Sequence, residues 1–503
     1  ADLKFRSLWD ERFDISEGAA QLKINYEPLQ VDVGHIQALV NGVKISGKGL
    51  ASLNQSGWSY EMQSSVPTLT VSDLLKFWPA GFKVKSHKWF DENIEKGTLR
   101  NLKVFIRQND QPKPELLSSF EFENANIKFL KHMPSISDGS GYGLIEKNKL
   151  IVVSQRGHIE TAEGGRVSIK DSVFKILDTN IPNPPAKFDL QVDGSIPSVF
   201  SLLKNKPFEI EKKIDRNFAD TSGHLNFNAE LSSVLKKGTK IEDVDYRVVG
   251  RLQNVQTRAI VPGKDFAARS LNILVDPNKL RISGDGTISE IPFSGSWTQP
   301  FGKSDLPSQA IVQLEVSDSS LKNLNIPMPK NALSGKTFGD LTLDIKKGSV
   351  TTFTLKSDLL GATIDIPALS WKKESDIPAK FEISGAFSKP MSIDRFKMES
   401  KDFLAVGDME FDNDGLKVAS LDELEVGNWL SSNVDLTRQN PGEPMQIKLS
   451  GGTLDLRNLP LSKSSGTTAP LVADLDNLRI SDDLALNEVS AQFSGGDSFQ
   501  GKF

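Results

Sequence analysis

The stretch FGDLTLDIKKGSVTTFTLKSD, residues 338–358, alternates apolar and polar side chains on both sides of a short turn. Apolar residues occupy every second position before the turn (Leu341, Leu343 and Ile345), and the alternation resumes after it with Phe353. A period of two is typical of a β-strand with one face in water and one apolar face. The fold of this stretch therefore depends on what covers its apolar face.

The same alternation recurs along the whole chain, for example in GHLNFNAEL (223–231), AIVQLEVSD (310–318) and MQIKLSGGTLDL (445–456). At the usual strand length, the pattern indicates roughly thirty strands, separated by turn sequences such as Asn413-Asp414-Gly415. Separate β-sandwich domains should be divided by linkers and shifts in composition, and the sequence contains neither. We therefore predict a mostly β fold: a long, curled antiparallel β-sheet forming an elongated hydrophobic groove, with a few short helices.

The composition excludes several classes of site. The 503 residues are 38% hydrophobic and 25% charged, as expected of a folded chain. The net charge of −5 and the pI near 5.8 give no basic footprint, so we expect no nucleic-acid partner. The absence of cysteine from the sequence excludes disulfides and thiolate chemistry within the chain.

The ends of the sequence suggest a piece of a longer protein. The chain starts at Ala1 without a basic-then-apolar signal region, and no stretch approaches the roughly 20 apolar residues that span a bilayer. We expect residues 1–503 to be one continuous segment of such a protein, with any membrane anchor outside it.

Helical patterns are few. Ser72 is a candidate N-cap for a short helix that Pro79 would end, and residues 86–96 predict a second helix. Together they predict a helical insert near 71–97, and residues 198–205 predict a further helix. Three aromatic residues are expected to pack the insert against one edge or end of the sheet: Trp78, Trp89 and Phe90.

No catalytic or metal-binding arrangement is visible. The histidines are scattered, and the glycine-rich DGSGYG (138–143) is interpreted as a loop because it lacks the strand and long helix of a phosphate-binding loop. The carboxylates at 408–414 lack the spacing of an EF-hand. We therefore predict no enzyme activity, no cofactor and no metal. Aromatic residues in phase with Leu, Ile and Val are expected to fill an apolar strand face.

Residues 74–106, LLKFWPAGFKVKSHKWFDENIEKGTLRNLKVFI, carry a more individual pattern. A Trp-Pro pair, a short basic segment, a helix, an Asn and a Gly returning into a strand resemble the central motif of YhdP-type proteins. These belong to the AsmA-like family, which also includes TamB. The matching positions are Trp78, Pro79, Trp89, Asn93 and Gly97. A weaker resemblance to the same strand series extends over residues 279–297, 403–436 and 447–459.

This resemblance implies a β-groove in the periplasm of Gram-negative bacteria, anchored in the inner membrane by a segment outside this chain. The groove would carry phospholipids toward the outer membrane, with outer-membrane proteins as further partners, and without catalysis.

An apolar trough independently suits lipid, because acyl chains can lie on its floor while the headgroup stays in water. We predict that the following side chains line one concave surface: Leu225, Phe227, Leu231, Leu280, Ile282, Val312, Leu314, Val316, Leu341, Leu343, Ile345, Phe353, Leu355, Ile364, Ile366, Phe381, Ile383, Ile447 and Leu449. Two alternatives stay open: a structural or adhesive protein of several β-sandwiches without lipid cargo, and a carbohydrate-binding β-protein.

Overall fold

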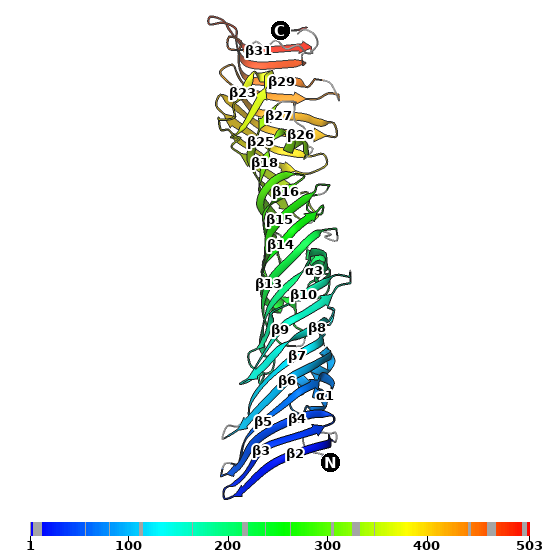
Figure 1. Cartoon of the computed structure of the whole chain (residues 1–503). Coiled ribbons are helices and arrows are strands. Elements are labelled where there is room, and N and C mark those ends of the chain that lie inside the picture. Colours follow the sequence, from blue (N-terminus) through cyan, green and yellow to red (C-terminus); the bar gives the residue numbers. More distant parts are fainter. Residues whose placement is uncertain are drawn as a thin grey trace. The chain divides into compact units, whose positions relative to one another are not determined.

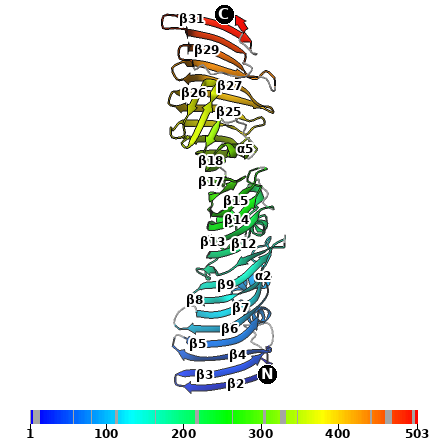
Figure 2. The ribbon, with the colours of Figure 1, turned by 45° about the horizontal axis from the view of Figure 1, so that its top comes forward.

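The computed structural model describes residues 2–3, 13–55, 57–79, 81–109, 114–162, 164–213, 220–236, 238–261, 263–302, 306–323, 332–346, 348–440, 444–459, 469–494 and 500–502. Strands dominate these residues and helices are short (Figures 1 and 2), which confirms the predicted mostly β fold. The chain divides into two compact units: Ala1–Ile260 with Asn272–Asn278, and Val261–Leu271 with Lys279–Phe503.

In the first unit, each strand from β2 to β9 pairs antiparallel with the next in sequence. Strand β9 then pairs with both β10 and β11, which pair with β12, and β13 and β14 follow. The bounds are β1 Asp2–Leu3, β2 Phe13–Tyr26, β3 Leu29–Val40, β4 Val43–Asn54, β5 Gly57–Thr70, β6 Ile94–Gln108, β7 Glu115–Ile127, β8 Ile136–Glu146, β9 Lys149–Glu160, β10 Arg166–Ile169, β11 Ser172–Ile176, β12 Pro185–Ser195, β13 Ser222–Val234 and β14 Asp245–Thr257.

The second unit repeats this arrangement in the order β16, β17, β18, β20, β21, β24 and onward to β32. Strands β29 and β30 pair in parallel, whereas the other pairs of this series are antiparallel. The bounds are β16 Lys279–Ile288, β17 Ile291–Pro300, β18 Ser308–Val316, β20 Thr337–Ile345, β21 Thr352–Ser357, β24 Lys380–Ala386, β25 Ser392–Ser400, β26 Phe403–Asp412, β27 Gly415–Val426, β28 Leu430–Thr437, β29 Gln446–Asp455, β30 Leu471–Arg479, β31 Ala485–Ser494 and β32 Gln500–Lys502. Strand β15, Phe266–Val275, has residues in both units.

The opening stretch of sequence forms β20 and β21 as predicted. Its turn is closed by a hydrogen bond from the Ser349 N–H to the Lys346 carbonyl, at 3.1 Å. Lys347, within this turn, lies outside the described residues.

β-Bulges bend neighbouring strands of the first unit. Asn101 on β6, Asn124 on β7 and Asp138 on β8 have φ of 51°, 53° and 52°, and each lies at a register shift. Asn and Asp tolerate this left-handed conformation better than other side chains do, and a bulge adds bend and twist to its strand. These positions therefore contribute to the curl of the strands (Figure 2).

The helices are α1 Val71–Phe77, α2 Val84–Asn93, α3 Ile196–Leu203, α4 Ile210–Lys213 and α5 Asp318–Asn323, with 3-10 turns at Ile241–Asp243 and Pro367–Leu369. The predicted cap at Ser72 is wrong: Thr70 is the N-cap, and its hydroxyl accepts the N–H of Asp73 at 3.1 Å. The second helix also ends before the predicted residue 96, because α2 ends at Asn93 and β6 begins at Ile94, which pairs with Ile127.

A small separate sheet is formed by β19 Leu333–Gly335, β22 Ala362–Ile366 and β23 Trp371–Lys373. Strands β22 and β23 follow β21 in the sequence, but β21 pairs directly with β24, so they leave the main sheet. Ile364 and Ile366, predicted to line one concave surface with Phe353, lie on β22 of this small sheet, because alternation predicts a strand but not its partner.

Candidate functional site

The predicted apolar side chains on the main sheet of the second unit share one face of that sheet, here called the inner face. Leu343 lies opposite both Ala310 and Phe353, and Leu341 lies opposite Leu355. Residues directly opposite each other in a ladder project to the same face. The same register places these predicted residues on the inner face: Leu280, Ile282, Val312, Leu314, Val316, Leu341, Leu343, Ile345, Phe353, Leu355, Phe381, Ile383, Ile447 and Leu449.

In the first unit, the three predicted residues also share a face. Leu225 lies opposite Gly194 of β12 and Phe227 lies opposite Val192. Leu231, four residues after Phe227, lies opposite Phe188 and projects to the same face. This face, the inner face of the first unit, continues through β10 and β9 by the pairs of Val167 with Gly194 and Ile159.

The predicted residues differ in burial. Leu225, Leu280, Phe353 and Leu449 are buried, and the other fifteen residues of the predicted set are half-buried. Whether any of them contacts lipid stays a prediction.

The most exposed apolar side chains on the inner face lie on β2 to β5 and were missed by the sequence prediction. Ile24 lies opposite Val31, and Val31 lies opposite Ala51, so these side chains project to the same face. Alternate residues along the same strands place Val43 and Val66 of the buried cluster on this face. Exposed members are Leu22 62%, Ile24 49%, Tyr26 80%, Ile36 42%, Leu53 40%, Trp58 50% and Met62 57%. Alternation in AQLKINYEPLQVDV (20–33) signalled the strand, but it gave no information on what covers the face.

The small sheet covers part of the inner face in the second unit. The ring of Trp371 stacks on Phe403 with centroids 4.1 Å apart, and Ile364 and Ile366 pack against the same buried cluster. That cluster includes Met398 and further residues of β26 to β31. This part of the inner face is thus a packed core.

Lys373 anchors the small sheet. Its side chain is 1% exposed, and the ammonium donates to the carbonyl oxygens of Leu359 at 2.7 Å, Ala362 at 2.8 Å and Glu374 at 3.1 Å. Burial lowers the pKa of Lys373, with Asp358 and Asp376 opposing the shift. With its donors engaged by backbone carbonyls, this lysine is a structural anchor.

The helical insert meets the sheet through α1. Leu74 and Phe77 pack on the cluster of Val66, Leu69 and Leu99 on the inner face. The rings of the predicted aromatic residues contact one another and His87. The ring centroids of Trp78 and Phe90 are 5.6 Å apart, those of Trp89 and Phe90 are 5.7 Å apart, and those of Trp78 and His87 are 5.7 Å apart.

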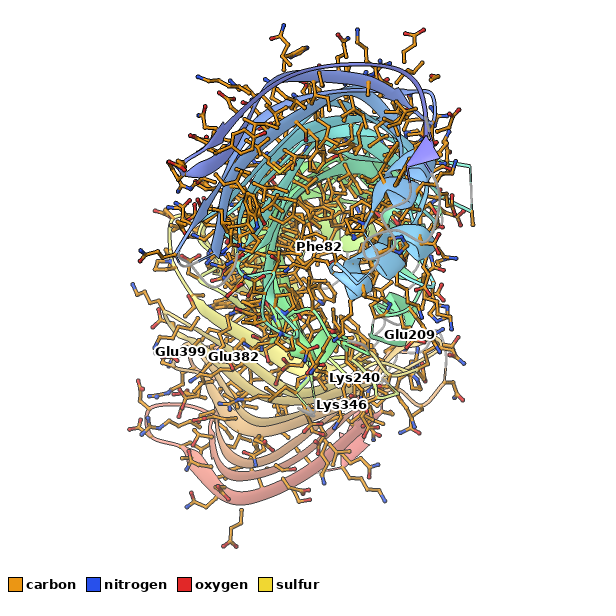
Figure 3. All side chains as sticks on the ribbon, turned by 90° about the horizontal axis from the view of Figure 1, so that it is seen from below. Phe82, Glu209, Lys240, Lys346, Glu382 and Glu399 are labelled. Carbon is orange, nitrogen blue, oxygen red and sulfur yellow. The ribbon has the colours of Figure 1, made fainter. Side chains whose placement is uncertain are left out.

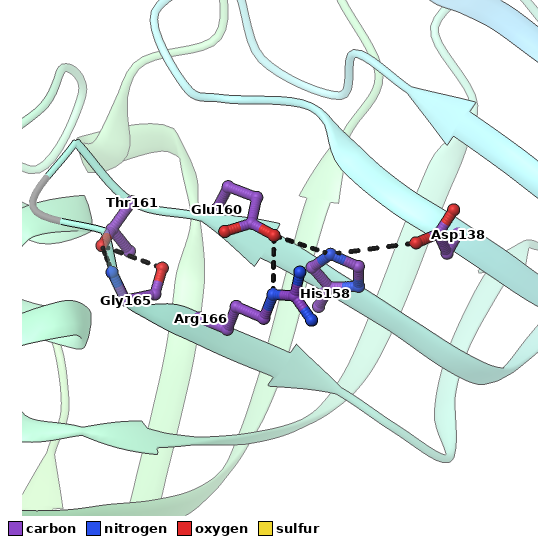
Figure 4. A network of polar contacts seen from close by, with 6 residues as sticks. All are labelled: Asp138, His158, Glu160, Thr161, Gly165 and Arg166. Atoms are coloured by element: carbon purple, nitrogen blue, oxygen red, sulfur yellow. Dashed lines mark hydrogen bonds and ion pairs between the residues drawn. The ribbon is translucent and has the colours of Figure 1, made fainter.

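A polar network surrounds His158 on β9 (Figure 4). Its Nε2 lies 3.2 Å from Glu160 Oε1 and 4.0 Å from Asp138, and Arg166 Nε donates to Glu160 at 2.6 Å. The neighbouring Ile159 is 3% exposed on the inner face, so His158 faces the other side of the strand. Its acidic and basic partners are half exposed or more, which is typical of surface ion pairs that join adjacent strands.

The glycine-rich motif at 138–143 is part of strand β8, so its interpretation as a loop was wrong. A Cβ on Gly143 would lie 2.2 Å from the ring of Phe120, and one on Gly141 would lie 2.9 Å from Phe122 and 1.9 Å from the Val153 carbonyl. The glycines therefore make room for two phenylalanine rings and the neighbouring backbone.

The carboxylates at 408–414 are partly engaged within the chain. Asp412 accepts a short hydrogen bond from Arg438 and another from the Asp414 N–H at 2.9 Å, and the Arg438 contact lowers the pKa of Asp412. Among the described residues, no group of three or more His, Asp or Glu side chains has the geometry to hold a metal ion. Over the same part of the chain, no helix combines the length and apolar character needed to cross a bilayer.

The model of the YhdP protein family matches residues 1–470, so the chain belongs to this family. No curated protein and no solved structure matches the chain.

Proposed function

We propose that this member of the YhdP family transports phospholipids between membranes, with acyl chains on the inner face and headgroups in water at the mouth of the curl. The observation that carries the proposal is the row of exposed apolar side chains on the inner face of β2 to β5, among them Leu22, Ile24 and Met62. Chains that fold independently rarely leave so contiguous an apolar surface without a ligand.

The energetics suit a carrier of acyl chains. Each CH₂ group moved from water onto an apolar surface contributes about 0.8 kcal/mol, so a lipid tail gains several times the thermal energy. A similar apolar floor at successive strands keeps differences between neighbouring positions small. A headgroup held in water avoids the cost of burying a charge.

The same proposal covers location and partners. The resemblance to bridge-like AsmA-type proteins supports a periplasmic location, an inner-membrane anchor outside residues 1–503, and outer-membrane proteins as partners. Movement of a lipid changes no covalent bond, so the chain acts as a conduit and not as an enzyme.

A photo-crosslinking experiment tests the transport proposal. With the photoreactive residue at position 343, on the inner face of β20, ultraviolet light should produce phospholipid adducts in cells. Position 340 is the matched control, because Asp340 is exposed on the opposite face and binds Gln313 at 3.2 Å. Equal labelling at the two positions, or no adduct at either, would contradict lipid passage.

A melting experiment addresses the alternative of a packed β-sandwich. Leu343→Asp should strongly reduce lipid adducts at neighbouring inner-face positions. It should lower the melting temperature only slightly, because Leu343 is half-buried. A collapse of the melting temperature would instead indicate that Leu343 belongs to an ordinary core.

A further inference from the structure

The strands of the first unit end at two rims, which the register identifies. Ile94, Ile127 and Ile136 are neighbours at the ends of β6, β7 and β8, and they mark the first rim. The turn that joins Glu146 to Lys149 lies at the opposite ends of β8 and β9 and marks the second rim.

The helical insert is rooted at the first rim. It leaves β5 after Thr70, which lies opposite Thr98 near the start of β6, and it returns to β6 at Ile94. Helix α1 packs Leu74 and Phe77 on the inner face, so the insert runs on the inner side of the sheet.

The loop between β11 and β12 belongs to the second rim. Ile176 lies opposite Leu150 at the end of β11. Beyond it, the N–H of Thr179 donates to the Asn148 carbonyl at 2.7 Å, in the turn between β8 and β9.

Lys83 joins the two rims. It is the N-cap residue of α2, and its ammonium donates to the Thr179 carbonyl at 2.9 Å and to Asn180 Oδ1 at 2.7 Å. The tip of the insert is braced by Trp78, whose indole N–H donates to the Phe82 carbonyl at 2.7 Å. The insert therefore crosses from one rim of the curled sheet to the other, and Figure 3 shows Phe82 directed into the interior of the curl.

We propose that this insert is a gate in the lipid path, held shut by the contact of Lys83 with Thr179 and Asn180. The inference rests on the proposed function. A lipid whose headgroup stays at the mouth of the groove cannot slide past a segment that joins both rims. Opening breaks the hydrogen bonds that Lys83 donates to Thr179 and Asn180, while α1 keeps Leu74 and Phe77 packed on the inner face.

A reversible cross-link tests the gate in the full-length protein in its native cells. Lys83→Cys with Asn180→Cys, joined by a bis-methanethiosulfonate reagent that spans the lysine side chain, should hold the insert across the groove. This chain contributes no other thiol. Photoreactive residues at Ile24 and Phe227 report lipid on the two sides of the insert, since β2 and β13 flank it in the strand order.

The cross-link should leave lipid adducts at one reporter and reduce those at the other to background, and a reductant should restore them. The matched control, Asn148→Cys with Asn180→Cys, joins two loops of the second rim and should leave both reporters labelled. Unchanged labelling at both reporters in the Lys83–Asn180 pair would overturn the gate. Absence of adducts in the untreated protein would refute the proposed function, and the gate with it.

A second measurement does not depend on lipid. Lys83→Ala should increase hydrogen exchange of the backbone N–H groups in 81–90 while exchange within β7 stays unchanged, because the latch is lost and the sheet is not. Equal exchange in the variant and the wild type would show that Lys83 holds nothing shut.

Discussion

Asp455, at the end of β29, shows how single side chains hold the strand ends of the second unit. It is 5% exposed and accepts two hydrogen bonds from the Arg457 guanidinium, at 2.9 and 2.6 Å, and one from the Arg457 N–H at 3.1 Å. These contacts lower the pKa of Asp455 from 3.8 to about 2.

A depressed pKa in the folded state means that the ionised carboxylate stabilises the fold. This stabilisation is complete above the unfolded pKa, near 3.8, and is lost as the pH falls through about 2. The difference in free energy of unfolding between the wild type and Asp455→Asn should therefore shrink over this range in urea titrations. A difference that stays constant or grows on acidification would contradict the assignment.

At the scale of elements, the small sheet and the strands it covers form a packed core, whereas β2 to β5 leave their inner face open. Two tryptophans illustrate the difference between these environments. Trp371 stacks on Phe403 and is 8% exposed, whereas Trp58 on β5 is 50% exposed. Trp371→Ala should lower the free energy of unfolding by about 3–5 kcal/mol, the usual cost of removing a buried aromatic side chain.

Trp58→Ala is the matched control. It should cost well under half as much in the same denaturant experiment, because its ring is already largely in water. Similar losses for the two variants would show that the inner face of β2 to β5 is also a closed core.

The same contrast explains what could be predicted at this scale. Alternation of apolar and polar residues was sufficient for β20 and β21, and it placed Leu341 and Leu343 on one face. It could not separate Ile364 from that face, because a strand in a small covering sheet alternates in the same way. Nor could alternation reveal that DGSGYG is a strand, since its glycines make room for the rings of Phe120 and Phe122 on another strand.

At the scale of the whole molecule, the family resemblance predicted a groove, whereas the contact of the helical insert with the second rim depends on residues far apart in the sequence. Lys83 and Thr179 are 96 positions apart, and no local pattern links them. The exposed face of β2 to β5 was equally invisible, because exposure depends on which elements fail to cover a strand. The sequence therefore predicted the type of surface and not its open and closed parts.

If the open part of the inner face is the lipid path, charge placed there should displace lipid without unfolding the chain. Ile24→Asp combined with Met62→Asp puts two carboxylates among exposed inner-face side chains, 49% and 57% accessible in the wild type. Desolvating them beneath an acyl chain is unfavourable. Mass spectrometry of the purified proteins should find phospholipid with the wild type and much less with the double variant.

Leu50→Asp supplies the matched control for this last experiment. Leu50 is 40% exposed but lies opposite Asp32 and Glu61, so it projects to the other face of the same strands. This variant should retain the wild-type lipid content, and all three proteins should melt at similar temperatures because the altered positions are exposed. Equal lipid loss with Leu50→Asp would indicate that lipid adsorbs to both faces of these strands. That result would contradict the proposal that the inner face is the lipid path.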